Sequence, residues 1–144
     1  MLGREGDALL DIERAETALA KASPGDLTGF FDHWDSLRLE GWRASVLLAL
    51  NRPADASRVL EPVAVGTPAK LPGPRAAVLA DLASALAQTA EVDRSCALLE
   101  EAFATAQLAG VHDGISRVRH VRREHLERWA DSSSVRRLDQ ALAS

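Results

Sequence analysis

Four histidines and one cysteine are the residues best suited to bind a metal or attack a substrate. The histidines are His33, His112, His120 and His125, and the cysteine is Cys96. His120 and His125 are five residues apart, so they do not share a helix face as a metal-binding pair four residues apart would. Cys96 falls in an apolar helical stripe, which is typical of a buried and inert thiol. We therefore expect neither a metal site nor a cysteine nucleophile.

Paired carboxylates could act together as a general acid and a general base. Two such pairs occur, Asp32 with Asp35 and Glu100 with Glu101. Solvated helix faces and helix ends account for both pairs. The sequence also has no glycine-rich phosphate loop, no zinc-ligand spacing and no nucleophile elbow. These observations predict a protein that is not an enzyme and that needs no cofactor.

The composition predicts an all-α fold in a single domain. The chain has 144 residues, which is an ordinary domain length. Its residues are 47% hydrophobic, but only 4% are aromatic and none is tyrosine. Alanine and leucine dominate, and both favour helices, whereas sheets prefer β-branched and aromatic residues. A domain of this size can bury enough surface to fold without a disulfide or a metal.

The charge and the single cysteine limit the partners and the compartment. The net charge is −4, which argues against a general affinity for nucleic acid. Residues 111–144 carry seven arginines against five acidic residues, a balance we interpret as a solvated helix face. One cysteine allows no internal disulfide, and no apolar run reaches the ~20 residues of a membrane span. We expect a cytoplasmic protein that does not contact membranes.

Helix-breaking residues divide the sequence into about seven predicted helices. A Pro- and Gly-rich loop is expected at about 65–74, and Gly110 is a natural helix stop. Residues 131–134 offer N-caps for the last helix. The predicted helices cover about 7–22, 27–50, a stretch from Pro53 to Val63, 75–89, 92–109, 113–129 and 135–143. Short turns between them force neighbouring helices to run antiparallel. The helices after residue 110 would form a terminal cap over about 111–144.

An internal repeat favours a stack of helical hairpins over a compact bundle or a globin-like packing. Residues 47–60 align with residues 86–99 at an offset of 39. Each copy places one small residue in each helix of a hairpin, Ala44 with Ala56 and Ala83 with Ser95. Helices approach to ~8–10 Å only where their side chains are small, so we expect these pairs to meet. The pattern is similar to the 34-residue tetratricopeptide repeat, with the extra residues in the 65–74 loop.

Several longer phrases extend this likeness to a known family. Residues 30–35, 37–41, 50–56, 82–96 and 129–139 resemble the C-terminal regions of actinobacterial helix-turn-helix transcriptional regulators. In that family the C-terminal tetratricopeptide-like part is taken to sense a ligand or to mediate assembly, and an N-terminal domain binds DNA. The first ~25 residues of this chain already fit the repeat region, so we expect no direct DNA binding by this chain alone. The resemblance implies a tetratricopeptide-like domain over residues 1–144.

One face of the first helix of each hairpin would line the groove of such a stack. If Ala44 and Ala83 face their partner helices, six other side chains become the candidate ligand- or partner-binding residues. They are Arg38, Trp42, Ser45, Asp81, Ser84 and Gln88. A plain solvated face is the alternative interpretation of these residues.

The predicted function is therefore non-catalytic. The chain would be a ligand-sensing or protein-interaction domain, the regulatory part of a transcriptional regulator, that binds a protein, a peptide or a small effector. The alternatives are a structural module that forms a homodimer and a stand-alone tetratricopeptide adaptor.

Overall fold

A computed structural model describes residues 29–144, with side chains from Asp35 onward. The helix predicted over 7–22, and the side chains of Asp32 and His33, lie outside the described residues. The described part is all-helical, without a strand. Its elements are α2 (Gly29–Ala49), α3 (Pro53–Gly66), α4 (Pro72–Gln88), α5 (Val92–Ala109), α6 (His112–His125), the 3-10 turn η1 (Glu127–Trp129) and α7 (Ser133–Leu142). Between residues 29 and 144, none of the helices is both long enough and apolar enough to cross a membrane.

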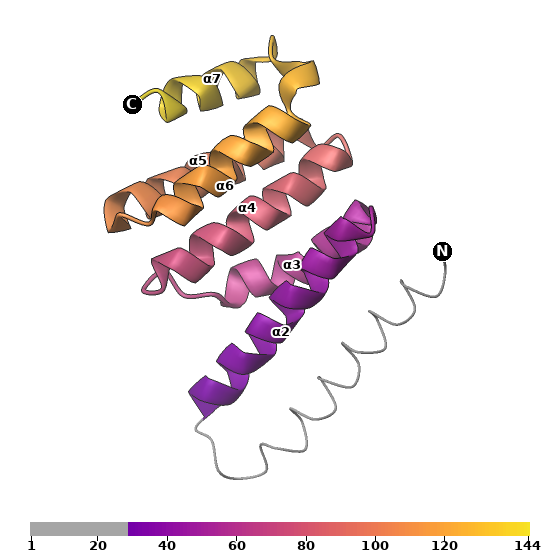
Figure 1. The fold of residues 1–144 in the computed structure, drawn as a ribbon, viewed down its shortest axis with the longest axis vertical. Helices are drawn as coiled ribbons and strands as arrows, with labels where there is room; N and C mark the ends of the chain where they lie inside the picture. Colours follow the sequence, from indigo (N-terminus) through magenta and orange to yellow (C-terminus); the bar gives the residue numbers. More distant parts are fainter. Residues whose placement is uncertain (1–28) are drawn as a thin grey trace.

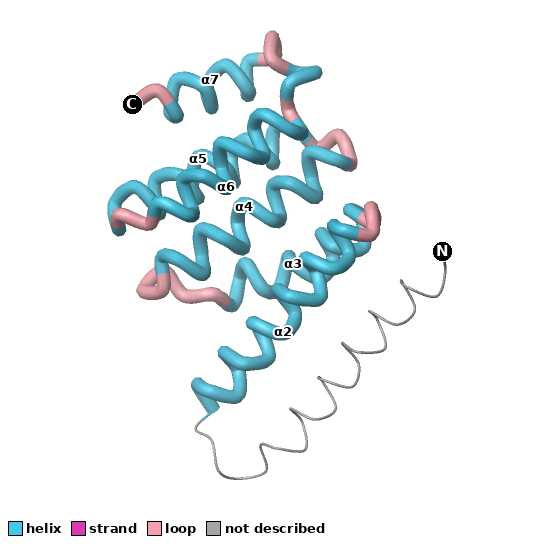
Figure 2. The backbone as a smooth tube through the Cα atoms, viewed as in Figure 1, coloured by secondary structure: helices cyan, strands magenta, loops and turns pink. Residues whose placement is uncertain are grey.

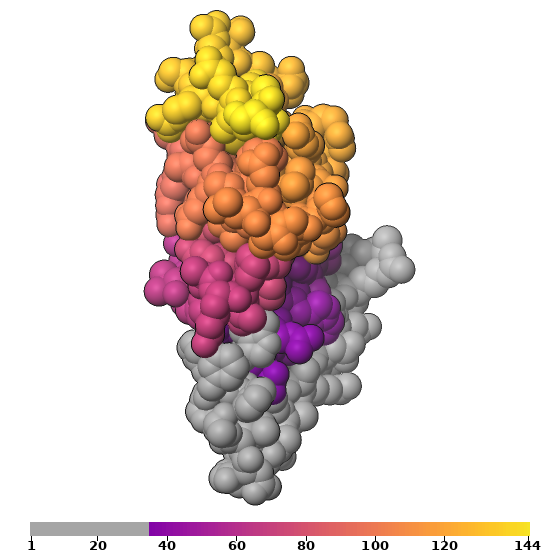
Figure 3. Space-filling view, turned by 90° about the vertical axis from the view of Figure 1, so that its left-hand side faces the viewer, coloured from indigo at the N-terminus to yellow at the C-terminus, as the bar shows by residue number. Residues whose placement is uncertain are grey.

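The helices form a stack in which neighbours along the chain run in opposite directions (Figures 1 and 2). The stack follows the order of the sequence along its long axis, from α2 at one end to α7 at the other, as the space-filling view also shows (Figure 3). Helix α4 lies in the middle and contacts α3, α5 and α6, with a smaller contact to α2. The predicted arrangement of antiparallel helices is confirmed.

The core follows α4 because this helix is buried on several sides. Its buried positions run almost without interruption from Leu79 to Ala87. Most of them are alanine and leucine, which allow helices to pack closely while losing little side-chain entropy. Leu82 and Leu86 pack toward α2 and α3, and Leu79 and Ala83 belong to the larger cluster that α5, α6 and α7 share. Helix α4 thus joins the two ends of the stack.

Left-handed residues close the tight turns between the helices. Asn51 (φ 58°), Ala90 (φ 65°) and Gly110 (φ 69°) follow α2, α4 and α5 respectively. A left-handed residue ends a helix by redirecting the chain and by placing its N–H on a carbonyl of the last turn. Gly110 ends α5 as predicted, and its N–H donates to the carbonyl of Gln107. Ala90 takes the same conformation in the predicted tight turn, although glycine adopts it more easily.

The predicted Pro- and Gly-rich loop over 65–74 is shorter than expected. Helix α3 continues to Gly66 and α4 already begins at Pro72, so only residues 67–71 connect them. Proline suits the first turn of a helix because its missing N–H would have no partner there. Arg75 explains the extension of α3, since its guanidinium donates to the carbonyls of Ala64 (3.1 Å) and Thr67 (2.9 Å). A second nitrogen of Arg75 pairs with Glu101 of α5 at 2.8 Å.

The contact between small residues is confirmed in the α4–α5 hairpin and stays a prediction in the α2–α3 hairpin. In the α4–α5 hairpin, the buried Ser95 hydroxyl donates to the carbonyl of Ala83 at 2.7 Å. In the α2–α3 hairpin, Ala44 packs in a cluster with Leu60, whereas Ala56 packs in another with Leu47. Each alanine therefore packs beside a leucine of the partner helix. This is the ordinary fit of large side chains into the gaps beside small ones.

The predicted helix over 113–129 ends earlier, at His125. The chain turns there to bury Leu126 completely, and Trp129 of η1 packs beside it against the core. Ser132 then caps α7 as predicted, since its hydroxyl accepts a hydrogen bond from the Val135 N–H at 3.3 Å. The apolar face of α7 is buried, so this helix closes the end of the stack.

Candidate binding groove

A pocket of about 250 Å³ lies between α2 and α4. The end of α3 and one side chain of α6 complete its walls. We call it the α2–α4 groove. Its lining consists of Leu37, Arg38, Gly41, Ser45, Val63, Thr67, Pro74, Ala77, Val78, Asp81 and Arg117. Helices α2, α3, α4 and α6 thus contribute to one surface, which requires the stack to be folded.

The inner wall of the groove is apolar. Leu37 and Val63 are buried, and Ala77 and Val78 lie beside them with partial exposure. The two hydroxyls of the lining are already engaged, because Ser45 donates to the Gly41 carbonyl (3.1 Å) and Thr67 to the Val63 carbonyl (2.7 Å). An apolar wall with a few polar groups is typical of small-molecule and peptide pockets.

Asp81 places a carboxylate in this groove. Its ion pair with Arg117 of α6 spans 3.5 Å, and Arg117 is closer to Asp113, at 3.0 Å. Burial raises the pKa of Asp81 above its ordinary value, and the nearby Arg117 charge opposes this shift. The net effect shows that desolvation outweighs the ion pair. Asp81 accepts no hydrogen bond from any residue that the structure describes.

Arg38 also lines the groove, from α2. Its side chain is exposed, and it forms no hydrogen bond or ion pair within residues 35–144. A guanidinium carries five N–H donors in a planar fork that matches a carboxylate or a phosphate. Arg38 therefore leaves a complete anion-binding group at the edge of the groove.

The structure brings three of the six predicted residues together. Arg38, Ser45 and Asp81 all line the α2–α4 groove. Trp42 is 49% exposed on α2 and is not part of the lining. Ser84 is only 8% exposed and accepts a hydrogen bond from the exposed Gln88 amide at 3.1 Å. The predicted stripe on α4 is thus present as a helix face, but only its first residue reaches the groove.

The sequence reasoning missed the contributions of α3 and α6. Arg117 lies 36 positions after Asp81, in the next hairpin, and belongs to an arginine-rich stretch that we interpreted as a solvated face. Val63 and Thr67 come from the end of α3 and the connection after it. No local pattern marks these residues. A repeat-based alignment of the stacked helices could have suggested that α6 adjoins α4.

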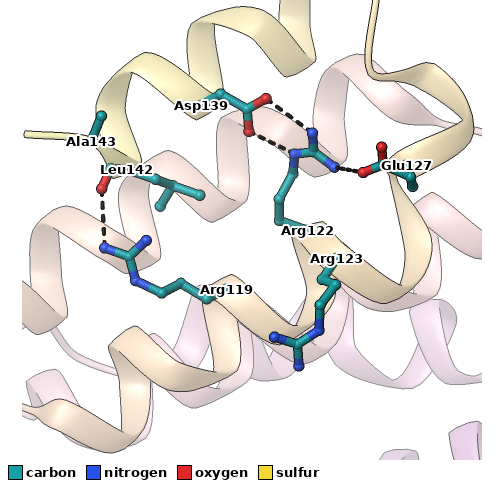
Figure 4. A pocket seen from close by; sticks show the side chains of 7 residues that line it. All are labelled: Arg119, Arg122, Arg123, Glu127, Asp139, Leu142 and Ala143. Atoms are coloured by element: carbon teal, nitrogen blue, oxygen red, sulfur yellow. Dashed lines mark hydrogen bonds and ion pairs between the residues drawn. The ribbon is translucent and has the colours of Figure 1, made fainter.

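A second pocket of about 450 Å³ lies between α6 and α7 (Figure 4). Here two arginines of α6 form hydrogen bonds with residues of α7. Arg122 pairs with both carboxylate oxygens of Asp139 (2.6 and 2.9 Å) and with Glu127 (2.9 Å). Arg119 donates to the carbonyl of Leu142 at 3.0 Å. We therefore interpret these contacts as structural, because they hold α7 against α6.

The thiol and the carboxylates that could take part in catalysis are buried or held in ion pairs. Cys96 is buried, as predicted, and burial raises the pKa of its thiol to about 11. A thiol with such a pKa is almost entirely protonated at neutral pH and is a poor nucleophile. Glu100 and Glu101 pair with different partners, Arg137 (3.4 Å) and Arg75 (2.8 Å). Among the described residues, no group of three His, Cys, Asp or Glu side chains converges on a common point.

Comparisons with known proteins give no relative. No protein-family model, no curated protein and no solved structure matches this chain.

Proposed function

We propose that this chain is a non-catalytic ligand-sensing domain, and that its ligand binds in the α2–α4 groove. The observation that carries the proposal is the lining of that groove. It combines an apolar wall around Val63 and Val78 with two charged side chains, Asp81 and Arg38, neither of which forms a hydrogen bond with the described residues. Leaving a desolvated carboxylate without a hydrogen-bonding partner lowers stability, and a ligand that supplies the partner would remove that penalty.

The size of the groove limits the ligand class. At about 250 Å³ the groove lies just below the usual range of drug-sized pockets. It suits a small effector, or one or two side chains of a peptide. Four helices meet at the groove, so a ligand there would contact both halves of the stack. Ligand binding would then stabilise the folded stack by mass action.

Such a domain would serve as the regulatory part of a cytoplasmic transcriptional regulator. Two observations support this proposal: the stack of antiparallel helices, and the likeness of several sequence phrases to the C-terminal regions of helix-turn-helix regulators. A ligand-dependent change in the stack could be passed to a separate DNA-binding domain. This chain would not itself contact DNA.

A thermal-shift screen with a library of small polar fragments tests the ligand proposal. We expect several compounds to raise the melting temperature of the wild-type chain. The variant Ala77→Phe fills the groove and should abolish these shifts, because the compounds would have no space to bind. Ala104→Phe, at an exposed position on α5 outside the groove, is the matched control and should preserve them. Shifts that survive in Ala77→Phe would contradict the proposal.

A dimerisation module is the second candidate function, and one surface feature favours it. Val65 and Leu108 are 88% and 91% exposed, and both line one open depression where the end of α3 meets the end of α5. Exposed apolar side chains that gather in one place are typical of protein contacts. Sedimentation velocity tests this candidate: a dimer that Leu108→Asp converts to a monomer would support it, and a wild-type monomer at high concentration would exclude it.

A further inference from the structure

The bonding capacity that remains in the α2–α4 groove can be counted group by group. The hydroxyls of Ser45 and Thr67 donate to main-chain carbonyls. Arg117 already holds Asp113 at 3.0 Å. Two charged groups of the lining stand out: the carboxylate of Asp81, which accepts no hydrogen bond from the described residues, and the guanidinium of Arg38, which has neither a hydrogen bond nor an ion pair with them. One is an anion and the other is a cation.

These two groups lie on different walls of the groove. Asp81 belongs to α4 and Arg38 to α2, and these two helices have only a small direct contact with each other. The apolar side chains of Val63 and Val78 line the same groove. A molecule that satisfies both charged groups must therefore carry a cation and an anion separated by an apolar spacer.

We propose that the α2–α4 groove recognises a small dipolar ligand, with an ammonium group that pairs with Asp81 and a carboxylate that pairs with Arg38. This inference rests on the proposed function, because it names the ligand class of the same groove. The ammonium supplies the hydrogen-bond donors that Asp81 lacks, and it competes with the long ion pair to Arg117. The carboxylate can receive two parallel N–H donors from Arg38. The apolar spacer would contact the apolar lining around Val63 and Val78.

Burial of Asp81 supports the ammonium end of this assignment. Its carboxylate side chain is 25% exposed, and its nearest cation, Arg117, is 3.5 Å away. Burial therefore raises the pKa of Asp81 in spite of this ion pair. An ionised partner in contact distance stabilises the charged form of a desolvated carboxylate. The ligand ammonium would therefore bind more strongly here than it would to a fully exposed aspartate.

Three six-carbon probes separate the contributions of the two charges. They are 6-aminohexanoate, which carries both, hexanoate, which lacks the ammonium, and hexylamine, which lacks the carboxylate. Affinities are measured by calorimetry on the full chain, and the site is mapped by methyl NMR of Val63 and Val78. We expect 6-aminohexanoate to bind in the groove at least about tenfold more tightly than either single-charge probe, since each charge-assisted contact contributes about one tenfold step.

Two variants assign each charge to its residue. Asp81→Asn should weaken 6-aminohexanoate about tenfold without weakening hexanoate. Arg38→Gln should weaken 6-aminohexanoate and hexanoate but leave hexylamine unchanged. Asp131→Asn and Arg43→Gln are matched controls outside the groove lining, and they should change none of the three affinities. Thermal denaturation confirms that each variant is folded.

The outcomes separate this inference from the proposed function. Equal affinities of 6-aminohexanoate and either single-charge probe would overturn the dipolar ligand while leaving the groove as a binding site. The same holds if library fragments shift the groove methyls and 6-aminohexanoate does not. If neither the probes nor any library fragment shifts Val63 and Val78, both the inference and the proposed function are wrong.

Discussion

The hydroxyl of Ser95 donates a hydrogen bond of 2.7 Å to the main-chain carbonyl of Ala83, across the α4–α5 hairpin. Both residues are completely buried. Two helices can bring a hydroxyl so close to the partner backbone only where both side chains are small. This contact fixes how α5 sits on α4, and α4 in turn supplies one wall of the binding groove.

Replacing Ser95 by alanine removes this hydrogen bond. We expect Ser95→Ala to lower the free energy of unfolding by about 1 kcal/mol, because the net value of a buried hydrogen bond is of that order. Ser57→Ala is the control, since the Ser57 hydroxyl bonds only to the carbonyl of Ala54 in its own helix. That variant should be neutral or slightly stabilising, as alanine is the better helix former. Urea denaturation measures both, and equal effects would contradict the structural role of Ser95.

At Gly114, helix α6 approaches both α4 and α5 too closely for a side chain. A Cβ at this position would lie 2.9 Å from Ala106 Cβ and 3.1 Å from Ala76 Cβ. Both contacts are methyl groups fixed to helices, so the helices themselves must move apart. We expect Gly114→Ala to destabilise the chain by about 1–3 kcal/mol, which outweighs the helix preference of alanine of about 1 kcal/mol.

Gly41 provides the matched control for this variant. It also lies within a helix, but a Cβ there would meet no atom within 4 Å. Gly41→Ala should therefore raise the melting temperature slightly, because only the helix preference acts. If Gly114→Ala were as stable as Gly41→Ala, the close packing of α6 against α4 and α5 would be wrong.

Much of this fold could be predicted from the sequence because its signals are local. Gly110 ends α5, the turn at Ala90 follows α4, and Ser132 caps α7, all where short sequence patterns placed them. The predictions were wrong where residues distant in the sequence determine where a helix ends. Arg75 caps the end of α3 through the carbonyl of Thr67, so the Pro- and Gly-rich segment yields fewer loop residues than its composition indicates.

The candidate site likewise combines features that local sequence patterns predict with features that depend on packing between helices. Helix periodicity correctly grouped Asp81, Ser84 and Gln88 on one side of α4, but it could not tell which of them is covered. The approach of Arg117 depends on how α6 packs against α4, which no local pattern on α4 reveals. Periodicity also placed Trp42 on the same side of α2 as the groove residues, but its ring does not form part of the lining.

The raised pKa of Asp81 makes stability depend on pH in a defined direction. A carboxyl whose pKa is higher in the folded state than in the unfolded chain adds stability at low pH and loses it as the pH rises through the folded pKa. Asp81→Asn removes the charge and should therefore raise the melting temperature at pH 7. The gain should shrink toward zero at a pH below the unfolded pKa, where Asp81 is protonated. A destabilised variant at pH 7 would show that the ion pair to Arg117 outweighs burial.

The chain alone should not bind DNA in a sequence-specific manner. Its net charge of −4 disfavours the approach of phosphates, and the arginines between α6 and α7 are used in internal contacts such as Arg122 with Asp139. Fluorescence anisotropy with labelled duplexes at physiological salt measures this directly. Weak binding that disappears with added salt is compatible with our expectation. Sub-micromolar binding that depends on sequence would contradict it.

One solution measurement compares the α2–α4 groove with the other two hollows of the stack. Each hollow carries a methyl-bearing reporter: Val78 in the α2–α4 groove, Leu142 between α6 and α7, and Leu108 at the ends of α3 and α5. Methyl NMR spectra of the full chain are recorded as stabilising fragments are added. We predict that the Val78 methyls shift in a saturable way, and that Ala77→Phe suppresses the shift. Saturable shifts confined to Leu142 or Leu108 would show that the ligand site lies elsewhere.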